Sequence, residues 1–189
     1  RQFTGEKEHV ILLNLPFHIA IAGERIALNI VQHLSSIATY VNQYVLRARP
    51  FGIEILDTRK TLPGYRSLEK YAVRVGGGKN HRFGQSDLWM IKDNHKNFFG
   101  GIINAINFFN NVGTFYNQIE VEIHSLDELR EALKLNVPHL MLDNFSPDDI
   151  QKAIALKIKD VTYEVSGGIT FENIDKYLIK GVDAISIGK

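Results

Sequence analysis

Short apolar runs alternate with polar and helix-like stretches along most of this chain of 189 residues. Runs rich in aliphatic and β-branched residues predict buried strands. They lie at residues 52–56, 88–91, 119–123, 139–142, 161–165 and 184–187. From the third run onward they follow one another at about twenty residues, which leaves room for a strand, a loop and one helix. The pattern therefore predicts repeated parallel βα units.

Two of the intervening segments are expected to be helices. Apolar residues recur at helical spacing in residues 126–133 and in residues 150–158. Ser146, Pro147 and the two acids that follow supply a cap residue, a proline at the first helical position and first-turn acids. The second helix should therefore begin beside Ser146.

The chain before Pro50 has a different pattern. Residues 9–15 predict a buried strand or extended segment that Pro16 ends. An amphipathic helix is expected from about Glu24 to Arg47, because apolar residues recur there every three or four positions. Arg25 would then be a cation at a helix start, where it opposes the helix dipole and has no local explanation.

Six strands joined by helices suit either a closed barrel or an open doubly wound sheet, because both use right-handed crossovers. The positions of the polar residues distinguish the barrel from the open sheet. Ionisable residues or glycine stand at or near the C-terminal end of every predicted strand. In β/α barrels the reacting groups come from the C-terminal ends of several strands and open on one face. We therefore predict an α/β fold of the β/α-barrel type.

The amino-acid composition mainly excludes certain classes of protein and of chemistry. The 22 basic and 21 acidic residues give a formal charge of +1, so no global field drives binding to nucleic acid or an anionic membrane. An apolar fraction of 44% argues against disorder, and no apolar run is long enough to span a bilayer. The lack of cysteine removes thiolate chemistry and is typical of a reducing compartment, so we expect a cytoplasmic protein. Because the chain begins at Arg1, we expect a piece of a longer protein.

A basic group of residues is the first candidate site. Its members are Arg59, Lys60, His81, Arg82 and Lys92. If they converge on one barrel mouth, they suit a ligand with more than one carboxylate or phosphate, since arginine binds such groups through two hydrogen bonds. The alternative is a solvated charged rim.

An acidic pair is the second candidate. Glu122 and Asp143 stand at the ends of adjacent predicted strands. They could hold Mg²⁺, directly or through water, or accept hydrogen bonds from sugar hydroxyls. The alternative is ion pairing with the basic group, and both could apply at different stages of binding.

Glycines after the last two strands are the third candidate. Ser166, Gly167 and Gly168 precede an expected helix around Glu172, and Gly188 follows the next strand. Glycine lets backbone amides approach a phosphate closely, and a helix N-terminus adds a positive dipole. The alternative is tight turns without a ligand.

Several segments resemble the quinolinate phosphoribosyltransferase family, in order and over nearly the whole chain. They are residues 23–29 (GERIALN), 36–39, 57–61 (DTRKT), 76–82, 91–95 (IKDNH), 120–122, 141–144, 164–169 and 185–188. Ser36, Leu62 and Val75 depart from the glycine, threonine and cysteine common in the family, and none of them is a charged ligand group.

The resemblance implies a fold and an assembly. The family joins an N-terminal α/β sandwich to an incomplete β/α barrel. Residues 1–50 would then be the remainder of the sandwich domain with the connecting helix, and residues 51–189 would be the barrel domain that carries the active site. The family also implies a homodimer, or a higher homo-oligomer built from dimers, in which Arg25 reaches into the partner subunit's site.

The resemblance also implies an activity and roles for residues. Quinolinate would receive the phosphoribosyl group of phosphoribosyl pyrophosphate and lose carbon dioxide, giving nicotinate mononucleotide and pyrophosphate in NAD biosynthesis. The basic group would bind the two carboxylates of quinolinate. Glu122 and Asp143 would handle the ribose and Mg²⁺. The phosphate would be cradled by Ser166, Gly167, Gly168 and Gly188. The residues implied for catalysis are Lys60, Glu122 and Asp143.

Three alternatives stay open at this point. A related pyridine or molybdenum-associated phosphoribosyltransferase-like protein would share the segments at 57–61 and 76–82, but we expect it to lack the run at 92–95. A phosphosugar-binding isomerase barrel would share the glycine phosphate signals. A non-catalytic binding module would bind ligand without turnover.

Overall fold

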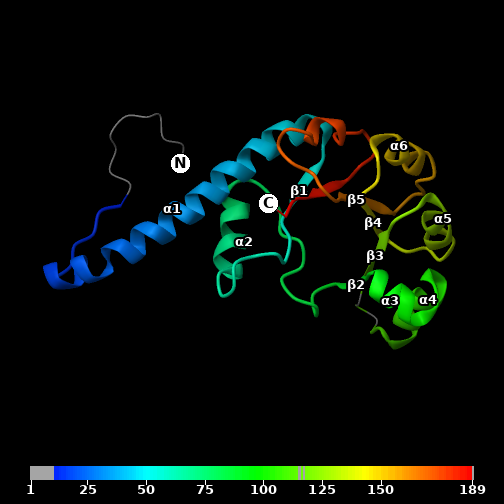
Figure 1. The fold of residues 1–189 in the computed structure, drawn as a ribbon, viewed down its shortest axis with the longest axis horizontal. Helices are drawn as coiled ribbons and strands as arrows, with labels where there is room; N and C mark the ends of the chain where they lie inside the picture. Colours follow the sequence, from blue (N-terminus) through cyan, green and yellow to red (C-terminus); the bar gives the residue numbers. More distant parts are fainter. Residues whose placement is uncertain (1–10, 115, 117, 189) are drawn as a thin grey trace.

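The computed structural model describes residues 11–114, 116 and 118–188, and its central feature is one parallel sheet. The six strands are ordered β1-β6-β5-β4-β3-β2 (Figure 1). They are β1 (Glu54–Leu56), β2 (Trp89–Ile91), β3 (Ile119–Ile123), β4 (His139–Asp143), β5 (Thr162–Ser166) and β6 (Ala184–Ser186). The edge strands β1 and β2 do not pair within the described chain, so the barrel is open between them. The prediction of an incomplete β/α barrel is confirmed, and the division into two domains stays a prediction.

Helices follow the strands along the chain. The α-helices are α1 (Phe17–Ala48), α2 (Arg66–Val75), α3 (Asp93–Phe99), α4 (Ile102–Val112), α5 (Leu126–Lys134) and α6 (Pro147–Ala155). Single 3-10 turns lie at Arg49–Phe51 and Ile174–Lys176. Ser146 caps α6 by accepting a hydrogen bond from the backbone N–H of Asp149, so this helix begins where the sequence predicted.

Strand residues alternate between two environments. On β3, Val121 and Ile123 are fully buried and belong to the main hydrophobic core. The neighbouring Glu122 faces the inside of the barrel, where it lines a cavity. The same alternation on β5 places Val165 in the core and Glu164 in that cavity. The sheet therefore has an apolar outer face and a polar inner face.

The N-terminal predictions need two corrections. Residues 9 and 10 of the expected strand lie outside the described residues, and residues 11–16 form no strand and are exposed, with Leu12 at 88%. Helix α1 begins at Phe17, immediately after Pro16, whose carbonyl accepts the backbone N–H groups of Ile19 and Ala20. Arg25 therefore lies inside the helix and not at its start.

The segment after β5 also differs from expectation. Instead of an α-helix around Glu172, the chain makes only the 3-10 turn Ile174–Lys176. The side-chain oxygen of Asn173 accepts the backbone N–H of Thr170, and the Asn173 amide donates to the carbonyl of Gly168. These local bonds hold a compact turn in place of a helix start. No α-helix dipole therefore supports phosphate binding at Gly167 and Gly168.

Helix α1 has a packed end and a projecting end. Tyr44 and Ala48 are fully buried near its C-terminus, where the helix packs against α2 and β1. Its N-terminal half extends away from the sheet (Figure 1) and exposes apolar side chains that include Phe17 and Ile26. Even so, none of the helices in the described ranges is long and apolar enough to cross a membrane.

Candidate active site

A cavity of about 260 Å³ opens at the C-terminal ends of the strands, and we call it the barrel cavity. It brings together the basic group, the acidic pair and the first residue of the glycine segment. The sequence-predicted residues on its wall are Arg59, Lys60, His81, Arg82, Lys92, Glu122, Asp143 and Ser166. Each of the six strands thus contributes a side chain to this cavity, either from its C-terminal end or from the loop that follows it. A solvated charged rim does not describe this arrangement.

The guanidinium groups of Arg59 and Arg82 are close enough for their charges to interact. Burial lowers the pKa of Arg82 from its usual value, and the like charge of Arg59 lowers it further. Arg82 is held by hydrogen bonds to the carbonyl of Leu88 at 3.1 Å and to the sulfur of Met90 at 3.4 Å. Repulsion between close cations is relieved when an anion binds between them. The barrel cavity is therefore prepared for an anionic ligand.

Asp57 connects the loop after β1, which carries Arg59 and Lys60, to the segment before β2, which carries His81 and Arg82. Its carboxylate accepts the ammonium group of Lys70 at 2.5 Å and the backbone N–H of His81 at 2.9 Å. Asn80 donates to the other carboxylate oxygen at 2.6 Å. Asp57 and Lys70 are both buried, at 8% and 3% exposure. The loop after β1 and the segment before β2 are therefore joined through one fully bonded carboxylate.

Arg66 makes a second connection between the same loops. Its guanidinium donates to the carbonyl of Arg59 at 3.2 Å and to the carbonyl of Phe83 at 3.1 Å. It also donates to the hydroxyl of Thr61 at 3.3 Å. Arg66 could not be recognised as a site residue from the sequence, because backbone carbonyls that accept a side chain leave no mark in the residue pattern.

His81 is engaged by protein groups on both ring nitrogens. The backbone N–H of Arg82 donates to Nδ1 at 2.8 Å, which leaves the ring proton on Nε2. Nε2 then donates to Glu120 at 2.8 Å. His81, Glu120 and Glu164 lie close enough to suggest a metal site, but a protonated Nε2 is not a metal ligand. The cluster is instead a hydrogen-bonded support beneath Arg82.

The acidic pair lies on the same wall as Lys92. Lys92 contacts the carboxylate of Glu122, so the predicted ion pairing between acidic and basic groups is present. His124 reaches toward both acids, with ring nitrogens 3.3 Å from Glu122 and 3.8 Å from Asp143. Its hydrogen bond to Asp93, at 2.5 Å, lowers the pKa of that carboxyl group. His124 was not predicted to be a site residue, although it stands one residue beyond the end of β3.

The carboxylates of Glu122 and Asp143 fit a hard divalent cation in donor chemistry. Both line the barrel cavity, and oxygen donors of this kind are those that Mg²⁺ prefers. Their side chains are 9% and 19% exposed, so they can be reached from the cavity. Mg²⁺ binding itself stays a prediction.

The glycine segment supplies free backbone donors. Gly167 has φ of +100°, and an added Cβ would lie 2.3 Å from the side-chain oxygen of Asn144. Gly168 has φ of +61° with open space around it. The backbone amides of these two residues and of Gly188 donate to no described residue. Only Ser166 of this set lines the barrel cavity itself, while Gly188 lies beside Thr58 and Lys60.

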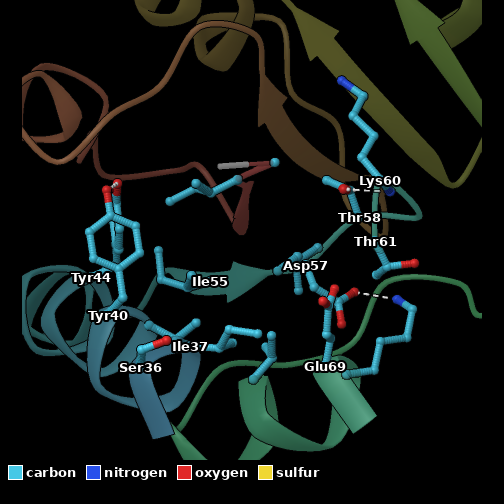
Figure 2. Close-up of a pocket in the computed structure, with 16 residues that line it drawn as sticks. Ser36, Ile37, Tyr40, Tyr44, Ile55, Asp57, Thr58, Lys60, Thr61 and Glu69 are labelled. Atoms are coloured by element: carbon cyan, nitrogen blue, oxygen red, sulfur yellow. Dashed lines mark hydrogen bonds and ion pairs between the residues drawn. The ribbon is translucent and has the colours of Figure 1, made fainter. Parts of the chain in front are cut away.

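A neighbouring pocket shares part of this wall, and we call it the side pocket. It measures about 460 Å³ and lies between α1, β1, α2 and the stretch after β6. Figure 2 shows Tyr40 and Tyr44 of α1 on one side and Thr58 and Lys60 on the other. Lys60 lines both spaces. The barrel cavity holds the basic group and the acidic pair, whereas the side pocket is largely apolar and is lined by Gly188.

Arg25, like the three predicted glycines, is a predicted residue that does not line the barrel cavity of this chain. It is exposed in the projecting half of α1 and lines neither the barrel cavity nor the side pocket. Its predicted contact with the site of a partner subunit is not tested by a single chain.

The family model for the quinolinate phosphoribosyl transferase C-terminal domain matches residues 37–189. The chain is 42% identical over 181 residues to the probable nicotinate-nucleotide pyrophosphorylase (carboxylating) of Bacillus subtilis. That alignment covers 96% of this chain and 63% of the relative. The corresponding human enzyme is 38% identical over 178 residues, with coverage of 92% and 60%.

A solved structure gives the same result for the fold. The nicotinate-nucleotide pyrophosphorylase of Francisella tularensis superposes with a TM-score of 0.86 at 41% identity. The match covers 91% of this chain and 61% of that one. The chain thus spans about three fifths of the length of the relatives it matches.

Proposed function

The chain belongs to the quinolinate phosphoribosyltransferase family, and we propose that it transfers the phosphoribosyl group of phosphoribosyl pyrophosphate to quinolinate with loss of carbon dioxide. The products are nicotinate mononucleotide, pyrophosphate and carbon dioxide, in a step of NAD biosynthesis. The observation that carries the proposal is the convergence of the basic group and the acidic pair on one cavity of about 260 Å³.

Quinolinate recognition rests on the basic group. Arg59 and Arg82 reach the cavity from loops that Asp57 and Arg66 hold together, and Lys92 enters from the end of β2. Two guanidinium groups can each bind a carboxylate through paired hydrogen bonds, as a planar dicarboxylate requires. His81 contributes by fixing the backbone of Arg82. These residues support the proposal that the cavity selects a dicarboxylate over a monocarboxylate.

Phosphoribosyl pyrophosphate would lie across the acidic pair and the glycine segment. Glu122 and Asp143 can accept hydrogen bonds from ribose hydroxyl groups, and the free amides after β5 and β6 can donate to the 5-phosphate. Lys60 stands between the two spaces and can bind a phosphate oxygen from either. Mg²⁺ held by Glu122 and Asp143 would neutralise the charge of the departing pyrophosphate.

The reaction needs positioning and electrostatics and no covalent nucleophile. The pyridine nitrogen attacks the anomeric carbon while pyrophosphate leaves, and positive charge develops on the sugar. The carboxylates of Glu122 and Asp143 stabilise that charge, and the cations hold the ring in line. When the adjacent carboxylate then leaves as carbon dioxide, its bonding electron pair stays on the ring carbon, where the positive charge of the neighbouring pyridinium nitrogen stabilises it until a proton is added.

We also propose a homodimer, or an assembly built from dimers. The projecting half of α1 exposes Phe17, Ile21 and Leu28, which lie on one side of the helix, and an apolar helix face of this kind is normally covered by another surface. Arg25 lies within the same exposed stretch. Packing of this part of α1 against a second copy would let Arg25 reach the partner's cavity. A cytoplasmic location stays a prediction.

The test measures products with the protein at the full length that its gene encodes. Mg²⁺, phosphoribosyl pyrophosphate and either quinolinate or nicotinate are supplied, and nicotinate mononucleotide, pyrophosphate and carbon dioxide are followed. Product from quinolinate with matching carbon dioxide supports the proposal. Product from nicotinate alone would keep the phosphoribosyl transfer and overturn the dicarboxylate assignment. Absence of product from both would favour a sugar-phosphate isomerase or a binding module.

A matched pair of variants tests the binding site. Arg82→Ala should raise the KM for quinolinate on the order of a hundredfold, because a lost hydrogen bond between charged groups costs about 1.5–3 kcal/mol. Arg130→Ala removes an exposed arginine on α5 and should leave KM unchanged. Unchanged quinolinate affinity in Arg82→Ala would contradict the assignment of the basic group.

A further inference from the structure

The inner end of the barrel cavity holds two polar groups without partners. Glu164 on β5 is 7% exposed, and its Oε1 has no hydrogen-bond partner among the described residues. Ser186 on the neighbouring strand β6 is 6% exposed, and its hydroxyl also lacks one. Both side chains line the cavity. Buried polar atoms are normally hydrogen-bonded, so two unpaired atoms facing one cavity indicate a place where a ligand or a proton is handled.

Glu164 shares its surroundings with a second buried carboxyl group. His81 presents a single N–H, on Nε2, which lies 2.8 Å from Glu120 and 3.5 Å from Glu164. The shorter contact makes Glu120 the acceptor of that proton. Two adjacent carboxylates around one donor repel each other, so the more weakly held group stays neutral. Burial, followed by the charge of Glu120, raises the pKa of Glu164 well above its usual value.

The other charged neighbours do not reverse this result. Lys92 on β2 acts in the opposite direction, but its ammonium group contacts Glu122, on β3. Ser186 on β6 lies beside Glu164 and favours its ionised form as a nearby hydroxyl donor would, although the two groups do not meet hydrogen-bond geometry, and this effect is weaker than the opposing effect of burial. Burial and the charge of Glu120 therefore favour the protonated form of Glu164, which is the form that can donate a hydrogen.

Glu164 also stands between two spaces. Besides the barrel cavity it lines a space of about 370 Å³ at the N-terminal ends of the strands, which we call the rear cavity. The rear cavity is bounded by residues at or before strand starts, such as Glu54, Gln118 and His139. Water can thus reach Glu164 from behind while a substrate covers its front.

We propose that Glu164 is the acid that protonates the pyridine ring carbon exposed by decarboxylation, an inference that rests on the proposed function. When the bond between ring carbon and carboxylate breaks, carbon dioxide leaves and the electron pair stays on that carbon, beside the positive nitrogen. The proton of Glu164 moves to the carbon, and Glu164 is left as a carboxylate. Water in the rear cavity returns a proton before the next turnover.

The remaining donors on the cavity wall are unsuited to this step. Arg59, Lys60, Arg82 and Lys92 are cations whose charge holds the anionic substrates, and ammonium and guanidinium groups are weaker acids than a carboxylic acid. The carboxyl groups of the acidic pair are already engaged by Lys92 and His124. Glu164 combines a neutral acid, an unpaired oxygen facing the cavity and a second access for solvent.

The test separates the two halves of the reaction in a Glu164→Gln variant of the full-length protein. Glutamine keeps the shape and a hydrogen-bond donor but has no acidic proton. We expect pyrophosphate release within about threefold of the unaltered protein. Nicotinate mononucleotide formed per pyrophosphate should fall at least about tenfold, with quinolinate mononucleotide accumulating. Glu131→Gln on α5, outside the cavities, should keep one nicotinate mononucleotide per pyrophosphate.

Each other outcome has a definite meaning. One nicotinate mononucleotide per pyrophosphate in Glu164→Gln, at an unchanged rate, would overturn the inference. An equal loss of both products would assign Glu164 to substrate binding or folding and would overturn it too, and circular dichroism of Glu164→Gln and Glu164→Leu would identify a folding defect. A pH profile adds a separate readout, because decarboxylation by the unaltered protein should fall as pH rises through the pKa of Glu164. If the unaltered protein releases no pyrophosphate with quinolinate, the proposed function fails and takes this inference with it.

Discussion

The guanidinium group of Arg66 donates a hydrogen bond to the backbone carbonyl of Arg59 at 3.2 Å. The same group donates to the carbonyl of Phe83, next to Arg82, at 3.1 Å. One side chain on α2 therefore fixes the spacing between the two loops that carry the guanidinium groups of the cavity. Arg66 itself does not line the barrel cavity, so its part in the reaction is to position other residues.

Arg66→Ala should weaken quinolinate binding more than turnover. Loss of both carbonyl bonds lets the loops separate, and the two guanidinium groups no longer match the spacing of two carboxylates. We expect KM for quinolinate to rise about tenfold, which corresponds to about 1.4 kcal/mol, with a smaller change in kcat. Steady-state kinetics at saturating phosphoribosyl pyrophosphate measures both constants.

Arg74→Ala is the matched control, because Arg74 is an exposed arginine on the same helix. It should leave both constants unchanged. Arg66→Lys keeps a cation but cannot bridge two carbonyls, so it should behave more like the alanine variant than like the unaltered protein. Full activity in Arg66→Lys would show that charge, and not the bridge, is what matters.

The buried pair of Lys70 and Asp57 supports a prediction on stability. Lys70→Ala leaves the carboxylate of Asp57 buried, with only Asn80 and the N–H of His81 as donors. Removal of one partner from a buried ion pair typically costs about 3–5 kcal/mol. Urea unfolding followed by circular dichroism should show a loss of that size, and a loss below about 1 kcal/mol would mean that water replaces the ammonium group.

Much of the barrel was predictable because its strands are short runs with clear ends. The run at 119–123 coincides with β3, and Ser146 starts α6 as its capping chemistry requires. The start of α1 was not predictable in the same way. Phe17, Ile19 and Ile21 alternate with smaller or polar residues, which is a strand pattern, and the helical spacing becomes visible only further along.

Site residues could be predicted where a charged side chain lies at a strand end. They could not be predicted where the orientation of a side chain depends on contacts with the backbone. Lys92 and Asp143 could be placed on one face because parallel strands share an end. The orientation of His81 depends on the N–H of Arg82 and on Glu120, two contacts that no spacing rule encodes. The unpaired oxygen of Glu164 follows from the packing of several strands and is visible only in three dimensions.

Asp87 supports a prediction on pH. Its carboxylate accepts the backbone N–H groups of Phe83 and Gly84, at 2.7 and 2.9 Å, and these bonds lower its pKa in the folded chain below the usual 3.8. A lowered folded pKa means stability that is fully present above the unfolded pKa and lost as pH falls through the folded one. Asp87→Asn should therefore be less stable than the unaltered protein near neutral pH.

Thermal unfolding at several pH values measures this difference. The gap in Tm between Asp87→Asn and the unaltered protein should begin to close as pH drops below about 4, the pKa of an unfolded Asp. It should be lost once pH has fallen through the lowered folded pKa, where both side chains are neutral. Glu131→Gln on α5 serves as a control with a constant gap. A gap that persists unchanged into acid would mean that asparagine fails for a reason other than charge.

The last prediction concerns the two glycines after β5, which stand side by side and differ in what surrounds them. An added Cβ on Gly167 would lie 2.3 Å from the side-chain oxygen and 2.7 Å from the backbone nitrogen of Asn144. Asn144 in turn donates to Asp143 at 2.7 Å, so its displacement disturbs the acidic pair. Gly167→Ala should therefore lose stability and also raise the KM for phosphoribosyl pyrophosphate.

Gly168→Ala distinguishes the effect of backbone strain in the glycine segment from the effect of the contact between Gly167 and Asn144. Gly168 is exposed with φ of +61° and nothing within 4 Å of an added Cβ, so alanine costs only the left-handed backbone, about 1–2 kcal/mol. Its backbone amide stays available, and KM should change far less than in Gly167→Ala. Equal effects of the two substitutions on KM would mean that the loop acts through its backbone conformation alone, and that the contact between Gly167 and Asn144 has no part in holding Asp143 in place.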